Sequence, residues 1–555
     1  MLLSLIYFLL PNLLLAKTSD IQPKENLNTS EQVRFLTLDS DVLKKRLSIT
    51  PFSHQEKPTI NFPLPNGGNI EVTAKKIKIW EKEQSHSQFW EVQSTDSANK
   101  SHGVINSTAL GIHAMLVLPN KEIILLKPAS LPSENNYMVQ TRKSIPLSKR
   151  FEEVLYQNKK TNKPSIISRS TQQRVNYQGI TEYRLAVAAT GEFTEFFDSV
   201  ELAQASIANM ISHVNVIYER DLGIRFILVD NTNIIFEHPG EGFTADASLT
   251  ELGEQNGKIL VEHIGAENFD MGHVISFGQN IGGLAYIGGA CNPDPAIKAS
   301  GASRTYDPMS GAFDIDYLGH EMGHQVGATH TFNSNEGLCA GTRTPETAVE
   351  PGSGNSIMSY AGLCGIDNTR ESSLSVFHIV SIEQIKQHLQ QYQSCGTVVA
   401  NDTNTPPNIE SFDNYIIVDA GQPFTLHAQA TDSDNDEISY SWDQVDAGTA
   451  SHTGNDYGDN AIFQIMDPTT ASQRTFPAYT VYNRDIHFRL VVRDGNGAMS
   501  TEDVTVTVVN GKDLPNTTTA KASGGGHISV GFFFLLFFLS ACKLRIKEIK
   551  EAKLH

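Results

Sequence analysis

The stretch HEMGHQVGATH, from His320 to His330, contains three histidines and one glutamate at a spacing that suits a metal ion. His320 and His324 are four residues apart, so on a helix both imidazoles lie on one face, one turn apart. Gly327 lets the chain leave the helix through backbone angles that a Cβ would resist, and His330 can then return as a third ligand. Three protein ligands leave a fourth position open, which is typical of a catalytic zinc site rather than a structural one.

Glu321 lies between the first two histidines and is placed to act as the general base on a zinc-bound water. We expect the helix that carries the motif to run from about Asp314 to Val326, with Asp314 as its N-cap. Fixing Gly327 and His330 as well makes a chance match rare, on the order of one in ten thousand for a chain of this length. The alternative is an ordinary helix with surface or core histidines.

A second segment, SIMSY, follows downstream at Ser356 to Tyr360. Its order after HExxHxxGxxH resembles the Met-turn of the metzincin metalloproteases, in which a methionine packs beneath a three-histidine zinc site. The resemblance places Met358 in that position. The alternative is a methionine that only fills the core.

The resemblance extends from about Glu182 to Cys395, where the chain looks like the bacterial reprolysin-like (M12B-type) metallopeptidases. The segments that carry it are YERDLGIRF, FDMGHVISFG, GGLAYIGGAC, the zinc helix, EPGSGNSIMSYAGLCG and SIEQIKQHLQQY. The resemblance implies a zinc endopeptidase that acts on protein or peptide substrates, with an α/β (α+β) catalytic domain at 179–400 built on a twisted mixed sheet. It also implies that the three histidines of the motif bind Zn²⁺ and that Glu321 is the catalytic base.

Tyr360 departs from the pattern of the animal reprolysins, which usually have proline at this place. The M-x-Y spacing is instead similar to that of the astacins and serralysins, in which the tyrosine approaches the zinc and stabilises the oxyanion. Tyr360 is therefore a candidate for that catalytic role, and a packed aromatic ring is the alternative.

GGLAYIG, from Gly282 to Gly288, is predicted to form a strand at the rim of the cleft. An extended substrate peptide would add to this strand through main-chain hydrogen bonds, and an ordinary edge strand is the alternative. His273 and His378 are expected to be structural residues rather than metal ligands.

Charge and the N-terminal residues favour an exported protein. The chain has 555 residues and a formal net charge of −19, which argues against a nucleic-acid binder. Residues 1–16, MLLSLIYFLLPNLLLA, are predicted to be a signal peptide, because the apolar run is short for a membrane anchor.

Four of the five cysteines lie in the protease-like region, an even number that in an exported protein suggests two disulfides. Four cysteines allow three pairings. Similarity to the reprolysins implies the pairs Cys291–Cys395 and Cys339–Cys364.

Residues 17–178 are predicted to be a β-rich propeptide, because they alternate like strands between turn signals. This region contains no cysteine, which excludes latency through a propeptide thiolate on zinc. Any inhibition must then be steric or use another ligand. Lys149–Arg174 is polar and basic and is expected to be a linker where processing occurs.

The C-terminal residues 527–555 combine a short apolar run with a basic end, after a Gly-rich linker at 512–526. This tail, which holds Cys542, resembles the GlyGly-CTERM sorting signal of Gram-negative bacteria. The resemblance implies cleavage near Gly524–Gly526, export and tail-processing machinery as partners, and a secreted or cell-surface protein. A permanent C-terminal membrane anchor is the alternative to transient attachment.

Residues 404–511 are predicted to form a β-sandwich that resembles PKD-like, Ig-like or cadherin-like repeats. Asp432, Asp434 and Asp436 could gather a Ca²⁺ ion, and a solvated polar turn is the alternative. A second hypothesis for the whole chain is an adhesion or binding protein that acts through this module, with an inactive protease domain. The intact Glu321 and histidines argue instead for the endopeptidase.

Overall fold

The protease-like region is built on a mixed sheet whose strand β11 (Ile180–Ala189) is buried from Leu185 to Ala189. The computed structural model describes residues 21–23, 33–47, 58–84, 86–96, 100–119, 122–131, 135–142, 151–157, 180–399, 404–478 and 483–509. The predicted signal peptide, Gly-rich linker and C-terminal tail lie outside these residues. Within the described ranges, the helices are too short or too polar to span a bilayer.

The order of the mixed sheet is β10-β14-β15-β13-β11-β12, with β16 also pairing with β11. Neighbouring strands are parallel except for the antiparallel pairs β14–β15 and β11–β16. The remaining strands are β10 (Phe151–Tyr156), β12 (Ile224–Leu228), β13 (Met271–Phe277), β14 (Ile281–Tyr286), β15 (Gly301–Thr305) and β16 (Thr397–Val399). This confirms the mixed α/β architecture expected from the sequence.

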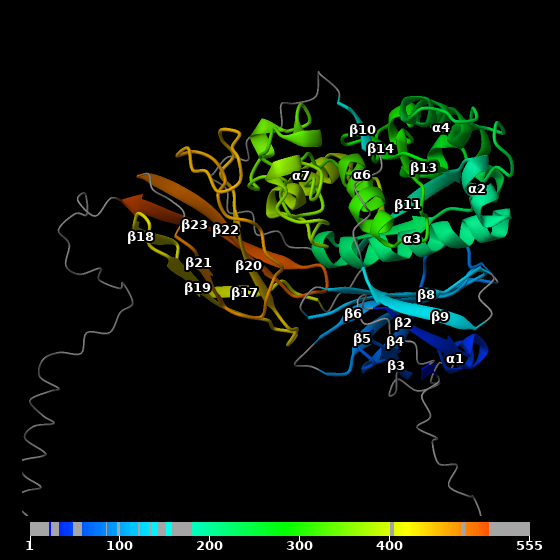
Figure 1. The fold of residues 1–555 in the computed structure, drawn as a ribbon, viewed down its shortest axis with the longest axis horizontal. Coiled ribbons are helices and arrows are strands. Elements are labelled where there is room, and N and C mark those ends of the chain that lie inside the picture. Colours follow the sequence, from blue (N-terminus) through cyan, green and yellow to red (C-terminus); the bar gives the residue numbers. More distant parts are fainter. Residues whose placement is uncertain are drawn as a thin grey trace, which may run out of the picture. The chain divides into compact units, whose positions relative to one another are not determined.

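Helices cover both faces of this sheet because alternate side chains of β11 point to opposite faces. Leu185 and Val187 share a core with α3 (Val200–Leu222), whereas Ala186 and Ala188 pack with α4 (Leu249–His263). Figure 1 shows α3 as the long helix beneath the sheet. The other helices are α2 (Gly191–Phe197), α5 (Pro295–Lys298), α6 (Gly319–Gln325) and α7 (Ile379–Leu389).

The predicted metal-binding helix is present, but it begins differently. A π-helical turn, Asp314–Leu318, precedes α6. The expectation that Asp314 is an N-cap is wrong, because the residue before it is already helical. Asp314 instead forms a buried pair with His213 of α3, with Oδ2 and Nδ1 2.7 Å apart. The pair fixes this helix against α3.

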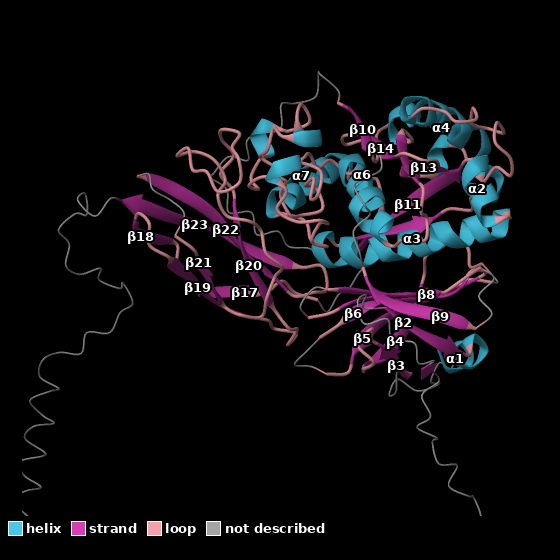
Figure 2. Cartoon of the chain, viewed as in Figure 1, coloured by secondary structure: helices cyan, strands magenta, loops and turns pink. Residues whose placement is uncertain are grey.

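The N-terminal residues form a nine-stranded antiparallel sheet in the order β1-β2-β9-β8-β7-β6-β5-β4-β3. Figure 2 draws its strands in magenta. In β7, Ile112, Ala114 and Leu116 face the core of this sheet, whereas Met115 and Val117 join the core around α3. The region is therefore β-rich, as predicted, and one face packs on α3. Its elements are β1 (Ile21–Pro23), β2 (Val33–Leu38), α1 (Ser40–Leu47), β3 (Thr59–Pro63), β4 (Asn69–Ile77), β5 (Gln88–Ser94), β6 (His102–Thr108), β7 (Gly111–Val117), β8 (Ile123–Pro128) and β9 (Asn136–Thr141).

The expectation of a linker at Lys149–Arg174 is wrong for Phe151–Tyr156, which form strand β10. β10 pairs in parallel with β14, with Glu153 opposite Gly283. Local sequence did not reveal this strand, because its hydrogen bonds come from the exposed edge of β14 rather than from its own pattern.

The C-terminal module consists of two sheets, β17-β19-β21 and β18-β23-β22-β20, which share one apolar core. Trp442, Phe476 and Leu490 are among its buried residues. Arg489 pairs with Glu383 of α7 and joins this module to the protease-like region. The strands are β17 (Asn408–Phe412), β18 (Tyr415–Asp419), β19 (Phe424–Thr431), β20 (Ser439–Gln444), β21 (Gln473–Phe476), β22 (Arg484–Arg493) and β23 (Met499–Val509).

Candidate active site

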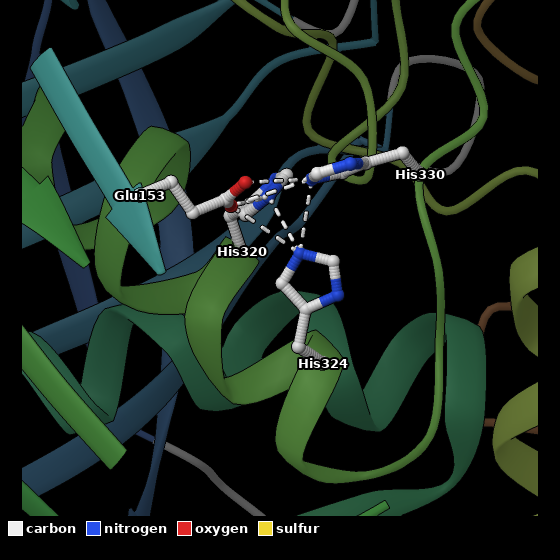
Figure 3. A group of neighbouring side chains, drawn as sticks. All are labelled: Glu153, His320, His324 and His330. Atoms are coloured by element: carbon white, nitrogen blue, oxygen red, sulfur yellow. Dashed lines mark hydrogen bonds and ion pairs between the residues drawn. The ribbon is translucent and has the colours of Figure 1, made fainter. Parts of the chain in front are cut away.

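Three histidine side chains converge where α6 ends and the chain turns back (Figure 3). The Nε2 atom of His324 lies 3.0 Å from that of His320 and 3.2 Å from that of His330. All three side chains are buried. Gly327, at φ 116°, makes the turn that returns His330, and a Cβ there would also collide with His388. The structure thus brings together the three residues predicted as ligands.

The second nitrogen of each imidazole ring, Nδ1, has a backbone carbonyl as its partner. The Nδ1 atoms of His320, His324 and His330 donate to the carbonyls of Ile357, Ala328 and Thr342, at 2.6, 2.8 and 2.7 Å. In the neutral imidazoles that bind a metal, the proton is therefore on Nδ1, and the three Nε2 lone pairs point toward one another.

Converging lone pairs repel unless a cation lies between them. Tetrahedral zinc with Zn–N bonds of about 2.0–2.1 Å places its ligand atoms about 3.3 Å apart. The observed separations of 3.0 and 3.2 Å are close to this value. The donor set and its spacing therefore fit a zinc ion held by the three histidines.

The predicted Met-turn lies beneath the histidines. Met358 is fully buried, and a Cβ on Gly323 of α6 would collide with its Sδ. Its carbonyl accepts the N–H of Thr331, 3.1 Å away, directly after the third histidine. The turn thus supports the three histidines from below and explains why glycine is needed at 323.

A buried carboxylate that the sequence did not single out organises this turn. Glu350 accepts the backbone N–H groups of Asn355 and Ser356, at 2.7 and 3.0 Å, and the hydroxyl of Thr331 at 2.6 Å. These bonds join the strand-like segment after His330 to the Met-turn. No spacing rule in the sequence points to Glu350, because its partners are backbone N–H and hydroxyl groups that the fold brings to it.

Glu321 is fully buried beside the histidines and packs against the backbone of Gly283 in β14. A Cβ at Gly283 would collide with the Glu321 carboxylate. Its Oε2 atom has no hydrogen-bond partner within the described ranges. Burial raises the pKa of Glu321 well above its usual value, and the charge of Glu153 raises it further. This unpartnered oxygen is available to a water or substrate at the site.

Glu153 of β10 is the site residue that sequence reasoning missed. Its Oε1 lies 3.0, 3.4 and 3.3 Å from the Nε2 atoms of His320, His324 and His330. Burial alone would raise the pKa of Glu153, but the charge of His330 and hydrogen bonds from the three imidazoles hold it well below its usual range. Burial lowers the pKa of His324 to about 4. The absence of cysteine from the N-terminal region left steric inhibition or another ligand as alternatives, and did not point to this carboxylate.

Tyr360 also reaches the cluster. Its hydroxyl donates to Oε2 of Glu153, and its ring lies 4.6 Å from that of His330 and 4.7 Å from that of Phe332. Burial raises the pKa of Tyr360 well above its usual value, and the charge of Glu153 raises it further. Tyr360 is therefore both a packed ring and a hydroxyl donor at the site.

The structure contains the disulfides Cys291–Cys395 and Cys339–Cys364, the two pairs implied by the resemblance. The second lies in the loop that supplies the Thr342 carbonyl to His330. A small cavity of about 30 Å³ lies next to Glu321 and Tyr360.

Residues 180–411 match the sequence model described as Metallo-peptidase family M12B, reprolysin-like. The match supports a reprolysin-like zinc metallopeptidase. It contains the mixed sheet from β11 onward, the three histidines, Glu321 and both disulfides. A peptidase acts on protein or peptide substrates. β10, with Glu153, lies before the matched residues.

Among solved structures, the chain is similar to one titled "Structures of Clostridium thermocellum CbhA fibronectin(III)-like modules". The identity is 9%, and the alignment covers 22% of this chain and 65% of that chain, with a TM-score of 0.15. A likeness at this level carries no argument about the fold or function of this chain.

The two other histidines considered in the reprolysin-like region have structural partners. His273 is buried in β13, 2.8 Å from Oε1 of Gln325 and 2.9 Å from Oγ of Ser303, and burial lowers its pKa to about 4. His378 accepts the N–H of Val380 and begins α7. Neither lies among the residues that could share a metal ion.

The predicted calcium residues are only partly brought together. Asp432 and Asp436 lie close to Asp494, with ligand atoms within 4.8 Å of one another. Asp434 is directed elsewhere, because its Oδ2 accepts the N–H and hydroxyl of Thr405 at 2.6 and 2.8 Å. Asp494 lies on the loop after β22, about sixty residues away in sequence, and so could not be found by local spacing.

Proposed function

We propose that this protein is a zinc-dependent endopeptidase that acts outside the cytoplasm, with His320, His324 and His330 as metal ligands and Glu321 as general base. The observation that carries the proposal is the convergence of three Nε2 atoms beside a buried carboxylate, one oxygen of which has no hydrogen-bond partner among the described residues.

Zinc, when bound, supplies a Lewis acid that lowers the pKa of water to about 7 and polarises the scissile carbonyl. Glu321 then takes the proton of the attacking water through Oε2 and delivers it to the leaving amine. Burial of the carboxylate excludes competing solvent. The position of Glu321 depends on Gly283, because a larger residue in β14 would occupy the space of the carboxylate.

Tyr360 supplies a hydroxyl that donates to the oxyanion formed during cleavage. Its raised pKa keeps the hydroxyl protonated under the conditions in which Glu321 acts as base. The substrate lies in an extended conformation along the edge of β14, which pairs with β10 in this structure.

The sequence further supports a secreted or cell-surface protease of a Gram-negative bacterium, exported through residues 1–16 and sorted through the tail at 527–555. Two disulfides in the catalytic region suit an oxidising compartment. The C-terminal module supplies a candidate Ca²⁺ site from Asp432, Asp436 and Asp494.

The test compares the proteolytically processed wild type with processed Glu321→Ala on casein and on a mixed peptide library, with and without a zinc chelator. We expect one bound zinc per chain in both proteins and a loss of at least about 100-fold in kcat for the variant. Equal cleavage by both proteins would refute the proposed base. Normal folding without zinc binding or cleavage would favour an adhesion protein acting through the C-terminal module.

A further inference from the structure

We propose that β10 is an inhibitory strand and that Glu153 provides the fourth zinc ligand in the uncleaved chain. This inference rests on the proposed function and adds its regulation. It begins from the position of one carboxylate oxygen. Oε1 of Glu153 lies 3.0–3.4 Å from the Nε2 atoms of the three histidines. The Nε2 atoms of His320 and His330 lie 3.0 and 3.2 Å from that of His324.

These distances are close to the separations between ligand atoms in a tetrahedral zinc site. Four ligand atoms around zinc, at bond lengths of about 2.0–2.2 Å, are separated by about 3.3–3.5 Å. Glu153 therefore occupies the corner that a catalytic site must leave open for water. Its side chain is only 2% exposed, so solvent does not compete for this position.

The backbone of β10 occupies the substrate edge at the same time. β10 pairs with β14 along its whole length, from Phe151 opposite Ile281 to Tyr156 opposite Tyr286. At Gly282 a Cβ would collide with the carbonyl oxygen of Glu152, so glycine is what lets β10 approach. A substrate that adds to this edge must displace β10.

The folded N-terminal sheet holds β10 in place. Arg142, just after β9, donates to the carbonyl of Ser373 at 2.6 Å and lies 3.4 Å from Asp316, one helical turn before His320. Asn106 of β6 donates to Ser212 of α3 at 2.6 Å. Such anchors raise the effective concentration of Glu153 at the metal site. Cleavage of the chain between β10 and β11 is what frees the strand to leave.

The experiment uses the full chain with Glu321→Ala, so that the precursor cannot cut itself, loaded with one equivalent of Co²⁺ or Zn²⁺. Into this background we introduce Glu153→Ala or Glu153→Gln. The matched control is Glu152→Ala, because Glu152 neighbours Glu153 on β10 but is exposed. Circular dichroism verifies that each precursor folds.

We expect Glu153→Ala and Glu153→Gln to change the visible absorption spectrum of the Co²⁺ protein. Both should bind a peptide hydroxamate, which needs the open metal position, at least about 100-fold more tightly than the Glu152→Ala control. Identical spectra and hydroxamate affinities in all variants would overturn the inference. In that case a bound metal ion, with cleavage by processed wild type, leaves the proposed function standing. Precursors that fold but bind no metal would refute both.

Discussion

Gly283→Ala is the substitution that most directly tests how Glu321, the proposed catalytic base, is positioned. A Cβ built at Gly283 falls inside the normal contact distance of Oε1, Cδ and Cγ of Glu321. The carboxylate must therefore move by at least about 1 Å to restore ordinary contacts. A displacement of that size in a reacting group costs about 100-fold in rate, or about 2.7 kcal/mol of transition-state stabilisation.

The assay measures kcat, KM and zinc content for the processed enzyme on a fluorogenic peptide. We expect kcat to fall about 100-fold while zinc content stays at one per chain, because none of the three histidines is among the atoms nearest to the new methyl group. A kcat within about 3-fold of wild type would show that Glu321 does not depend on Gly283 and would refute this account of its position.

Gly282→Ala provides a control at the next position of β14. Its Cβ would meet the carbonyl oxygen of Glu152 and the flexible end of Leu249, not Glu321. Once β10 is removed, only the contact with Leu249 remains. We therefore expect kcat to stay near the wild-type value and KM to rise, since a substrate chain follows the path of β10 along this edge.

Three other substitutions test the rest of the site and the C-terminal module. Gly323→Ala should weaken zinc binding and lower Tm, because the new methyl group collides with Met358; unchanged zinc affinity by chelator competition would contradict this. Tyr360→Phe should lower kcat of the processed enzyme by about 10- to 100-fold with little change in KM, and an unchanged kcat would leave Tyr360 as a packed ring only. Burial raises the pKa of Asp494 to about 6 from 3.8, so the folded state holds this proton more tightly than the unfolded state. That stabilisation, up to about 3 kcal/mol, is complete below about pH 4 and is lost as the pH rises through 6. Asp494→Asn should therefore flatten this part of a curve of Tm against pH. Ca²⁺ should raise Tm at pH 7 in the wild type but not in Asp494→Asn.

The candidate metal site could be predicted from the sequence because its residues lie close together along the chain. His320, Glu321 and His324 share one helix, and Gly327 and His330 follow within a few residues, so their spacing alone indicates where the side chains meet. The strand predicted at Gly282–Gly288 is also present, as β14 (Ile281–Tyr286). These features depend on short-range periodicity, which a single sequence displays directly.

Glu153, Glu350 and Asp494 were not predictable in this way. Each contacts partners that only the fold brings near. Glu153 reaches the histidines because β10 pairs with β14, and Asp494 lies close to Asp432 and Asp436 although it is distant in sequence. FEEVLY is polar enough to look like a linker, and only pairing with β14 makes it a strand. Asp314 was misassigned for a related reason, because His213 on a distant helix offered a stronger partner than a helix terminus.

An inhibitory strand and a substrate differ in the group that each places at the three histidines. β10 presents a carboxylate to the three histidines, so the group at the metal site is a side chain and not a peptide carbonyl. The backbone of Glu153 stays paired with Gly283, one side-chain length from the histidines. A substrate must instead bring its scissile carbonyl to the position of that carboxylate. An inhibitory strand can therefore lie along the same edge as a substrate and still resist cleavage, because its carboxylate occupies the place where the attacking water and the scissile carbonyl would have to meet.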